Sequence, residues 1–233
     1  MKDYKTTRRK FLNTSIKASA AIPFLPLVNQ ANETSLATAL EKHSDKKLNI
    51  LILGGTSYLG PHQIAYAMSR GHKITTFTRG KTKPTIHPEL FKNVEMLIGD
   101  REDNLEALKG RKWDAVIDNS GRKVKWTTDT AELLKNQVGM YVYISSVSAF
   151  YPYTGTDFSP SRKLVLKMPT DLEPGENRLY DYGIMKANSE NETKRVFGND
   201  RAAVIRPHFI VGPGDKQDRF HHWAVRSIEV EKL

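Results

Sequence analysis

The feature that most constrains the fold is a short apolar run that ends in a glycine-rich turn. Residues 48–53 are mostly aliphatic, with charged residues before them and glycine after them. Such a run predicts a parallel strand that is buried on both faces. Residues 54–60 form the turn, and residues 61–68 follow with apolar side chains at helical spacing. Because a helix N-terminus presents unpaired backbone N–H groups and a positive dipole end, this arrangement predicts an anion site. In a βαβ unit, the expected ligand is the pyrophosphate of a dinucleotide.

The spacing within this turn departs from the G-x-G-x-x-G pattern. Gly54, Ser57 and Gly60 occupy every third position, with serine in the middle. The first glycine permits a tight turn, and the last lets the helix pack closely on the strand. A turn that uses glycine only for positive φ remains an alternative interpretation of this stretch alone. The candidate cofactor contacts in the turn are Gly54, Thr56, Ser57, Tyr58, Leu59 and Gly60.

The rest of the chain alternates strands with helices. Apolar, β-prone runs predict strands at residues 72–78, 94–101, 113–118, 140–144 and 203–207. Helical patterns occupy residues 104–109 and 126–137, and another helix opens near residue 181. This alternation without hairpin signals predicts an α/β doubly wound parallel sheet, the Rossmann fold. Residues 151–180 are rich in proline with little periodicity, and we expect a substrate loop there.

Polar residues follow several of these strands. Arg79, after the second strand, would suit the 2′-phosphate of NADP, so we expect NADP to be preferred over NAD. Asp100 follows the third strand and would lie against the adenine, with Arg101 beside it. Asn119 opens a small-residue turn that would pass under the cofactor.

A tyrosine and a lysine four residues apart open the last predicted helix. Tyr182 and Lys186 therefore project from one helix face, about one turn apart. An ammonium beside a phenol favours the phenolate, which can exchange a proton with substrate near neutral pH. Ser146, at the end of the fifth strand, would hydrogen-bond the substrate oxygen.

These residues together resemble the extended short-chain dehydrogenases/reductases, of the NAD-dependent epimerase/dehydratase type. The resemblance covers about residues 48–220 and includes a strand ending in Arg206-Pro207. It implies that Ser146, Tyr182 and Lys186 are catalytic. It also implies that Pro207 lies against the nicotinamide half of the cofactor. The family continues beyond the position of Leu233 with a C-terminal substrate lobe, so the chain is either a truncated product or a short member.

The resemblance implies an NAD(P)-dependent oxidoreductase or epimerase. Its substrate would be a small molecule, sugar-like or related, that reacts at a carbonyl/alcohol carbon. Net redox chemistry and transient oxidation, as in epimerisation or dehydration, share this machinery and both stay open. The alternative is a non-catalytic binding protein that keeps the dinucleotide fold and binds RNA or another anion. Family members often dimerise through two helices, so a homodimer also stays open.

The first 39 residues have the order of an export signal. Arg8 and Arg9 precede Phe11-Leu12, and a modest apolar region follows at residues 18–28. Ala37-Thr38-Ala39 provides a small-x-small cleavage site, so we expect a twin-arginine signal peptide over residues 1–39. Residues 40–47 are then a linker, and residues 48–233 the NAD(P)-binding domain. The signal predicts a twin-arginine translocase as partner and a periplasmic or extracytoplasmic location.

Composition excludes several other classes. The net charge is +10, of which residues 1–39 carry +4 from six Lys and Arg against two acidic residues. The remaining +6 is scattered, so we interpret it as a solvated surface and expect no nucleic-acid partner. The chain has no cysteine, and its seven histidines show no metal-ligand spacing, so no metal site is predicted. The apolar region is too short and too broken for a stable membrane span.

Overall fold

We describe the protein from a computed structural model. It describes residues 46–217 except 154, 156–158, 173 and 174, and also residues 219 and 225. The chain divides into two compact units, residues 1–46 and 47–233, and nearly all described residues belong to the second. The predicted signal peptide and most of the predicted linker therefore lie outside the described residues.

Six parallel strands form one sheet in the described part of the chain. Their order across the sheet is β3-β2-β1-β4-β5-β6, and every neighbouring pair is parallel. This is the Rossmann order, in which the strand sequence reverses between β1 and β4. The predicted doubly wound α/β fold is confirmed. The strands are β1 (Asn49–Leu53), β2 (Lys73–Thr78), β3 (Glu95–Ile98), β4 (Trp113–Asp118), β5 (Val138–Ile144) and β6 (Ala202–Ile205).

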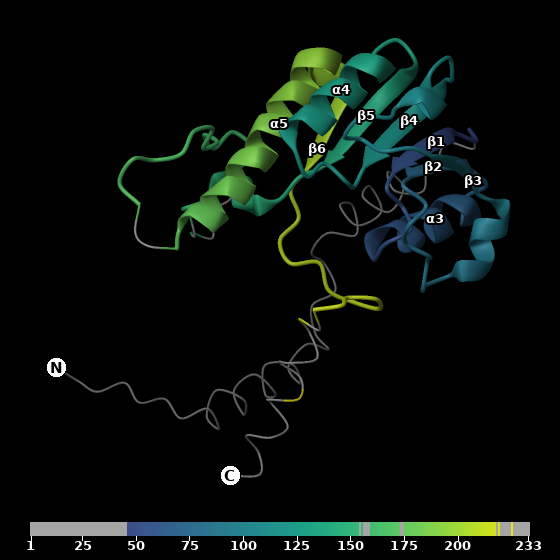
Figure 1. Cartoon of the computed structure of the whole chain (residues 1–233), viewed down its shortest axis with the longest axis horizontal. Helices are drawn as coiled ribbons and strands as arrows, with labels where there is room; N and C mark the ends of the chain where they lie inside the picture. The colour runs from purple at the N-terminus through teal and green to yellow at the C-terminus, as the bar shows by residue number, and fades with distance from the viewer. Residues whose placement is uncertain are drawn as a thin grey trace, which may run out of the picture. The chain divides into compact units, whose positions relative to one another are not determined.

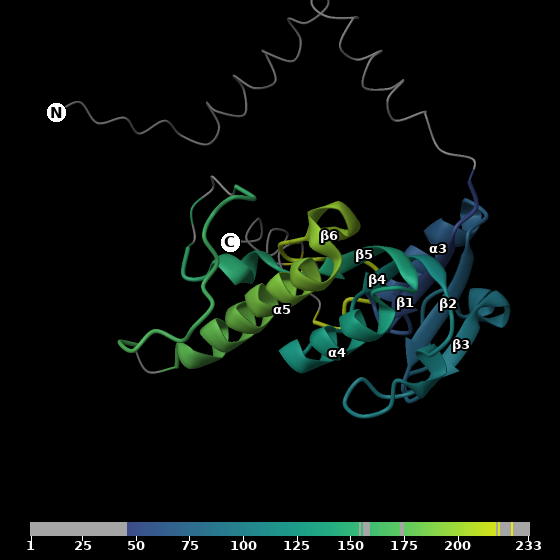
Figure 2. The same ribbon diagram turned by 90° about the horizontal axis from the view of Figure 1, so that it is seen from above.

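Helices pack on both faces of this sheet. They are α3 (Leu59–Ser69), α4 (Val124–Leu134) and α5 (Asn177–Arg201), the last interrupted by a non-helical Gly198. Figure 1 shows α4 and α5 together on one side of the sheet, with α3 on the opposite side. Figure 2 gives the same arrangement from above. Short 3-10 helices span Pro88–Asn93, Glu106–Leu108 and Val147–Phe150.

The first strand explains why both faces need covering. Leu51 and Leu53 belong to the core cluster under α4 and α5, whereas Ile50 and Ile52 belong to the cluster under α3. Since side chains alternate along a strand, a continuous aliphatic run reaches both layers. The carboxyl end of β1 is thus held rigidly from two sides.

Several predicted elements differ from the structure in extent, among them two helices. The helix predicted at residues 104–109 is a single 3-10 turn, Glu106–Leu108. The backbone N–H and C=O of Asn104 both bond to Asp100, which prevents a helix from starting there. Gly110, at φ +70°, then ends the turn. The last predicted helix begins at Asn177, four residues before the expected start.

No helix among the described residues is long and apolar enough to cross a membrane. Nor does the part of the chain that the structure describes contain a group of three His, Cys, Asp or Glu residues arranged to hold a metal ion.

Candidate functional site

The turn between β1 and α3 is shaped by three glycines. Gly54 and Gly55 have φ of +94° and +101°, a region that side chains other than glycine rarely adopt. A Cβ on Gly60 would lie 2.3 Å from the backbone of Gly55, so helix α3 approaches the turn as closely as two backbones allow. Gly55 was missed at the sequence level, although it directly follows Gly54.

The start of α3 fits a phosphate group. No side chain caps this helix end, and its first turn contains no acidic residue. Thr56 is buried, whereas Ser57 is exposed and its carbonyl accepts from the Gly60 amide at 3.0 Å. The Tyr58 hydroxyl is buried and has no hydrogen-bond partner among the described residues. Backbone N–H groups at the start of α3 can therefore donate to a ligand that carries phosphate, and the glycines let that ligand approach the backbone closely.

Tyr182 and Lys186 lie one turn apart on α5. Tyr182 is 46% exposed and Lys186 only 6%. The Lys186 ammonium is 5.8 Å from the centroid of the Tyr182 ring and 5.0 Å from that of Tyr143. It also donates to the Ile144 carbonyl at 3.0 Å. Burial lowers the pKa of Lys186, and the negative charge of Asp118 partly offsets that effect. The arrangement places a buried cation beside an accessible phenol.

Ser146 follows β5 and lines one pocket together with Tyr182 and Lys186. Its Oγ accepts from the Ser148 amide at 3.1 Å and donates to the Ser148 Oγ at the same distance. A Cβ on Gly183 would lie 2.2 Å from the Ser148 carbonyl oxygen, so α5 packs tightly against this loop. A pocket of about 600 Å³ results. Its lining includes seven of the predicted site residues, namely Tyr58, Leu59, Asn119, Ser146, Tyr182, Lys186 and Pro207.

Asn119 is fixed by a reciprocal amide pair. Its Nδ2 donates to Gln63 Oε1 at 2.6 Å, and Gln63 Nε2 donates back at 3.2 Å. Because Gln63 belongs to α3, this pair connects the end of β4 to the helix beside the glycine turn. Asn119 thus lines the pocket with Tyr182 on the side of the glycine turn.

The structure places Arg101 in the interior. It is 5% exposed, and its two terminal nitrogens lie 2.6 and 2.9 Å from the carboxylate oxygens of Asp118, which is fully buried. Tyr141 donates to the same carboxylate at 2.7 Å. Burial alone would raise the pKa of Asp118, but the Arg101 charge and these hydrogen bonds outweigh it, so the pKa is lowered. Arg101 thus carries a structural ion pair beneath the turn at Asn119, and its predicted contact with the cofactor stays a prediction.

The residues predicted to bind the adenosine half lie at other strand ends. Arg79 is exposed directly after β2, and no hydrogen bond or ion pair joins it to the residues that the structure describes. Asp100 is half-buried after β3, where its Oδ1 accepts from the Glu102 amide at 3.1 Å. Both follow neighbouring strands, as the prediction required, but they do not line the pocket with Tyr182.

A buried network was missed at the sequence level. Glu190 is fully buried on α5, and its carboxylate accepts two bonds from Arg206, at 2.8 and 2.6 Å. Ser145 donates to the same carboxylate at 2.5 Å. The four-residue spacing in the sequence could have indicated Glu190, since Glu190 follows Lys186 by four residues just as Lys186 follows Tyr182.

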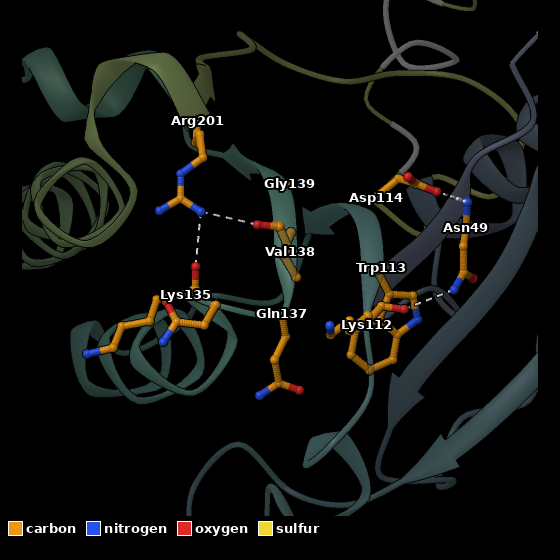
Figure 3. Close-up of a pocket in the computed structure, with 10 residues that line it drawn as sticks. Asn49, Lys112, Trp113, Asp114, Lys135, Gln137, Val138, Gly139 and Arg201 are labelled. Atoms are coloured by element: carbon orange, nitrogen blue, oxygen red, sulfur yellow. Dashed lines mark hydrogen bonds between the residues drawn. The ribbon is translucent and has the colours of Figure 1, made fainter.

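A second cavity lies at the amino ends of the strands, where β1, β4 and β5 begin (Figure 3). Several of its polar side chains donate to backbone carbonyls at the ends of strands and helices. Arg201 donates to the carbonyls of Lys135 and Val138, and the Asn49 side chain donates to the Lys112 carbonyl. Because this cavity is remote from Tyr182, we assign its polar residues a structural role and not a catalytic one.

Comparisons with known proteins relate the chain to one family model and to two curated proteins. The family model described as NAD dependent epimerase/dehydratase family matches residues 50–232. The chain is 28% identical over 182 residues to the chloroplast stem-loop binding protein of 41 kDa b of Arabidopsis thaliana, covering 73% of this chain and 43% of that protein. It is 29% identical over 182 residues to 2-alkyl-3-oxoalkanoate reductase of Stenotrophomonas maltophilia (strain K279a), covering 73% and 53%. The chain thus spans about half the length of these curated relatives.

Solved structures show the same fold. A UDP-N-acetylglucosamine 4-epimerase from Methanobrevibacter ruminantium M1, in complex with UDP-N-acetylmuramic acid, aligns with a TM-score of 0.56 at 16% identity, over 76% of this chain and 59% of that chain. The Bordetella bronchiseptica enzyme WbmG, in complex with NAD and UDP, aligns with a TM-score of 0.52 at 14% identity, over 72% and 57%.

Proposed function

Because the chain belongs to the NAD dependent epimerase/dehydratase family, we propose that it is an NAD(P)-dependent oxidoreductase or epimerase. Its substrate is a sugar-like or related small molecule that reacts at a carbonyl/alcohol carbon. One curated relative and two solved structures support this choice. The relative is named a 2-alkyl-3-oxoalkanoate reductase, and the solved structures hold UDP or UDP-N-acetylmuramic acid.

The observation that carries the proposal is the shared pocket of Ser146, Tyr182 and Lys186. Ser146, after β5, and Tyr182, on α5, both present hydroxyls to one cavity. The buried Lys186 ammonium lies beside the Tyr182 phenol. Proton exchange with a substrate oxygen needs a donor within hydrogen-bond reach of it. Tyr182, at 46% exposure, is accessible to such an oxygen.

Each side chain has a distinct role in this mechanism. Tyr182 gives a proton to the substrate oxygen on reduction and takes it on oxidation. Lys186 keeps a positive charge near the phenol and holds the nicotinamide ribose, while its own bond to the Ile144 carbonyl fixes its direction. Ser146 turns its hydroxyl from the Ser148 Oγ to the same substrate oxygen and orients it. The cofactor, when bound, supplies or accepts the hydride.

The proposed cofactor is NADP in preference to NAD. The turn at Gly54 and Gly60 would hold the pyrophosphate, and Asp100 the adenine. Arg79 supports the choice of NADP, because its exposed guanidinium at the end of β2 suits a 2′-phosphate.

A direct assay tests the function. The chain is incubated with NADPH and, in turn, with ketones and 3-oxo acids, and oxidation of the reduced nicotinamide is followed by absorbance. UDP-sugars are incubated with NADP⁺ instead, because epimerisation begins with hydride transfer from the sugar to the oxidised cofactor. Product analysis for the epimer is the readout there, since epimerisation consumes no net cofactor. Turnover of any of these supports the proposal. Saturated cofactor binding without turnover of any class would contradict it.

RNA binding is the second candidate function. It is supported by the relative named as a stem-loop binding protein and by the net +6 charge of residues 40–233. An RNA contact that neutralises several phosphates weakens steeply with salt. A stem-loop RNA bound tightly at low salt, and lost as salt rises, would favour this candidate. RNA affinity that NADPH leaves unchanged would place the RNA away from the cofactor site.

We also propose export by the twin-arginine translocase, supported by Arg8-Arg9 and the small-x-small sequence at residues 37–39. Replacement of both arginines by lysine should retain the chain in the cytoplasm. Unchanged fractionation would contradict export by this route.

A further inference from the structure

The pocket that contains Ser146 and Tyr182 is lined by several basic residues. They are Arg122, Lys186 and Arg219, and none of the described residues that line it is Asp or Glu. The dinucleotide proposed to bind here is itself anionic, so the basic lining as a whole does not identify a second anion. A contact with the substrate has to be assigned to a particular cation.

Two of these cations already have partners. Lys186 donates to the Ile144 carbonyl and lies over the rings of Tyr143 and Tyr182. Arg219 makes a forked pair with Asp215, at 3.0 Å to each carboxylate oxygen. The charge of Arg219 is therefore already compensated by a carboxylate, and Lys186 is directed toward the end of β5 and the Tyr182 ring.

Arg122 differs from both. It is exposed, and it forms no hydrogen bond or ion pair with the residues that the structure describes. Its positive charge repels that of Lys186. This repulsion lowers the pKa of the Lys186 ammonium, as burial does. Because an arginine stays protonated at any pH that proteins experience, this guanidinium is a permanent charge next to the catalytic lysine.

The backbone that carries Arg122 is held rigidly. A Cβ on the preceding Gly121 would lie 2.8 Å from the ring of Tyr143 and 2.9 Å from the Thr127 hydroxyl. The Ser120 amide donates to Asp118 Oδ1 at 3.1 Å, and Asp118 is itself locked by Arg101. A fixed attachment point lowers the entropy that binding would cost, which favours a specific contact over a loose surface charge.

We propose that Arg122 binds an anionic group of the substrate, a carboxylate or a phosphoryl group close to the reacting carbonyl carbon. This inference rests on the proposed function, which places that carbon between Ser146 and Tyr182. A guanidinium presents paired N–H donors that match the two oxygens of either group. The substrate class is then narrowed from any ketone or sugar to oxo acids and phosphate-bearing sugars. Arg122 orients the substrate and selects its charge, while Tyr182 carries the proton.

Paired probes that differ in charge test this role. Acetoacetate and methyl acetoacetate present the same ketone with and without a carboxylate. UDP-glucose and glucose present the same sugar with and without the phosphoryl groups of uridine diphosphate. Their affinities for the full chain saturated with NADP⁺ are measured by calorimetry. The variants are Arg122→Gln and Arg122→Lys, with Lys125→Gln as the control. Lys125 is an exposed cation of α4 that pairs with Asp129 and does not line the pocket.

Wild type should bind one charged probe at least about 10-fold more tightly than its neutral partner. Arg122→Gln should weaken that charged probe by about 10- to 100-fold and leave the neutral one within about 2-fold, since one charge-assisted bond is lost. Arg122→Lys should keep part of the preference, and Lys125→Gln all of it. Loss with acetoacetate identifies the group as a carboxylate, and loss with UDP-glucose identifies it as phosphoryl.

Three results would overturn the inference. One is an unchanged charged-to-neutral ratio in Arg122→Gln, and another is failure of wild type to bind any charged probe. The third is weaker NADP⁺ binding in Arg122→Gln with an unchanged ratio, because the guanidinium would then contact the cofactor. Failure of the proposed function has a different signature, namely charge-selective binding that depends on Arg122 but with no hydride transfer to or from any bound probe.

Discussion

Glu190 and Arg206 form a buried, two-pronged ion pair between α5 and the end of β6. Arg206 Nε donates to Oε1 of Glu190 at 2.8 Å, and a terminal nitrogen donates to Oε2 at 2.6 Å. The guanidinium also lies 4.8 Å from the centroid of the Phe150 ring. Because Ser145 donates to the same carboxylate, the pair fixes the residue before Ser146 to the helix that carries Tyr182.

Glu190→Gln should destabilise the protein strongly. The variant leaves the Arg206 charge, whose side chain is only 13% exposed, without its counter-ion. Loss of one partner costs up to about 3–5 kcal/mol for a buried pair. Urea unfolding followed by circular dichroism measures the free energy of unfolding. Glu132→Gln is the matched control, because Glu132 pairs with Arg195 at the surface, where such pairs are worth about 0–1 kcal/mol. Equal losses in the two variants would contradict a structural role for the buried pair.

Tyr182→Phe should abolish turnover and spare cofactor binding. The change removes only the hydroxyl that exchanges a proton, and such groups contribute about 10²- to 10⁴-fold to rate. Steady-state turnover and NADPH affinity are measured on the same preparation. Tyr66→Phe is the control, because Tyr66 is exposed on α3 and does not line the pocket. Full activity in Tyr182→Phe would mean that another group moves the proton.

The burial of Lys186 predicts a pH dependence of stability. Burial lowers its pKa in the folded state, so between that lowered value and about 10.4 the unfolded chain binds more protons than the native one. The contribution of Lys186 to the free energy of unfolding therefore rises with pH across this window. Lys186→Met should lack that rise.

Urea unfolding at several pH values between neutral and about 10 measures this difference. Lys109→Met serves as the control, since Lys109 is an exposed lysine paired with Glu106. Identical pH profiles for wild type and Lys186→Met would mean that the native state does not penalise the Lys186 charge.

Arg79→Ala should remove the preference for NADPH over NADH. The guanidinium is exposed after β2 and would pair with the 2′-phosphate that only NADPH carries. The loss should fall on NADPH alone, by about 10-fold or more for one charge-assisted contact. Arg111→Ala is a control, because Arg111 pairs with Glu95 elsewhere on the surface. Equal affinities for both cofactors in wild type would contradict the assignment of Arg79.

Local patterns were enough to predict the sheet and part of the site. The aliphatic run at β1 and the glycines after it depend on contacts between near neighbours in sequence, as does the four-residue spacing of Tyr182 and Lys186. Their periodicity and turn chemistry are therefore visible in the sequence itself. The length of α5 was underestimated, because residues 177–180 lack an apolar pattern of their own.

Interactions between distant strands were not predictable in the same way. Arg101 follows β3 and Asp118 ends β4, and the sheet order places β2 and β1 between those strands. Nothing local indicates that these two side chains meet in the interior, so the sequence predicts only a cofactor contact for Arg101. The pairing of Glu190 with Arg206 is not predictable from the sequence for the same reason, since it depends on where α5 crosses the end of β6.

The most direct test of the central claim is a titration of the chain with NADPH, followed by tryptophan fluorescence, with NADH titrated separately. Circular dichroism on the same sample establishes that the protein is folded. We predict saturable binding of NADPH that is tighter than that of NADH, because the glycine turn and the N-terminus of α3 present donors to the pyrophosphate. A folded chain that binds neither cofactor would contradict the assignment of this pocket as a dinucleotide site.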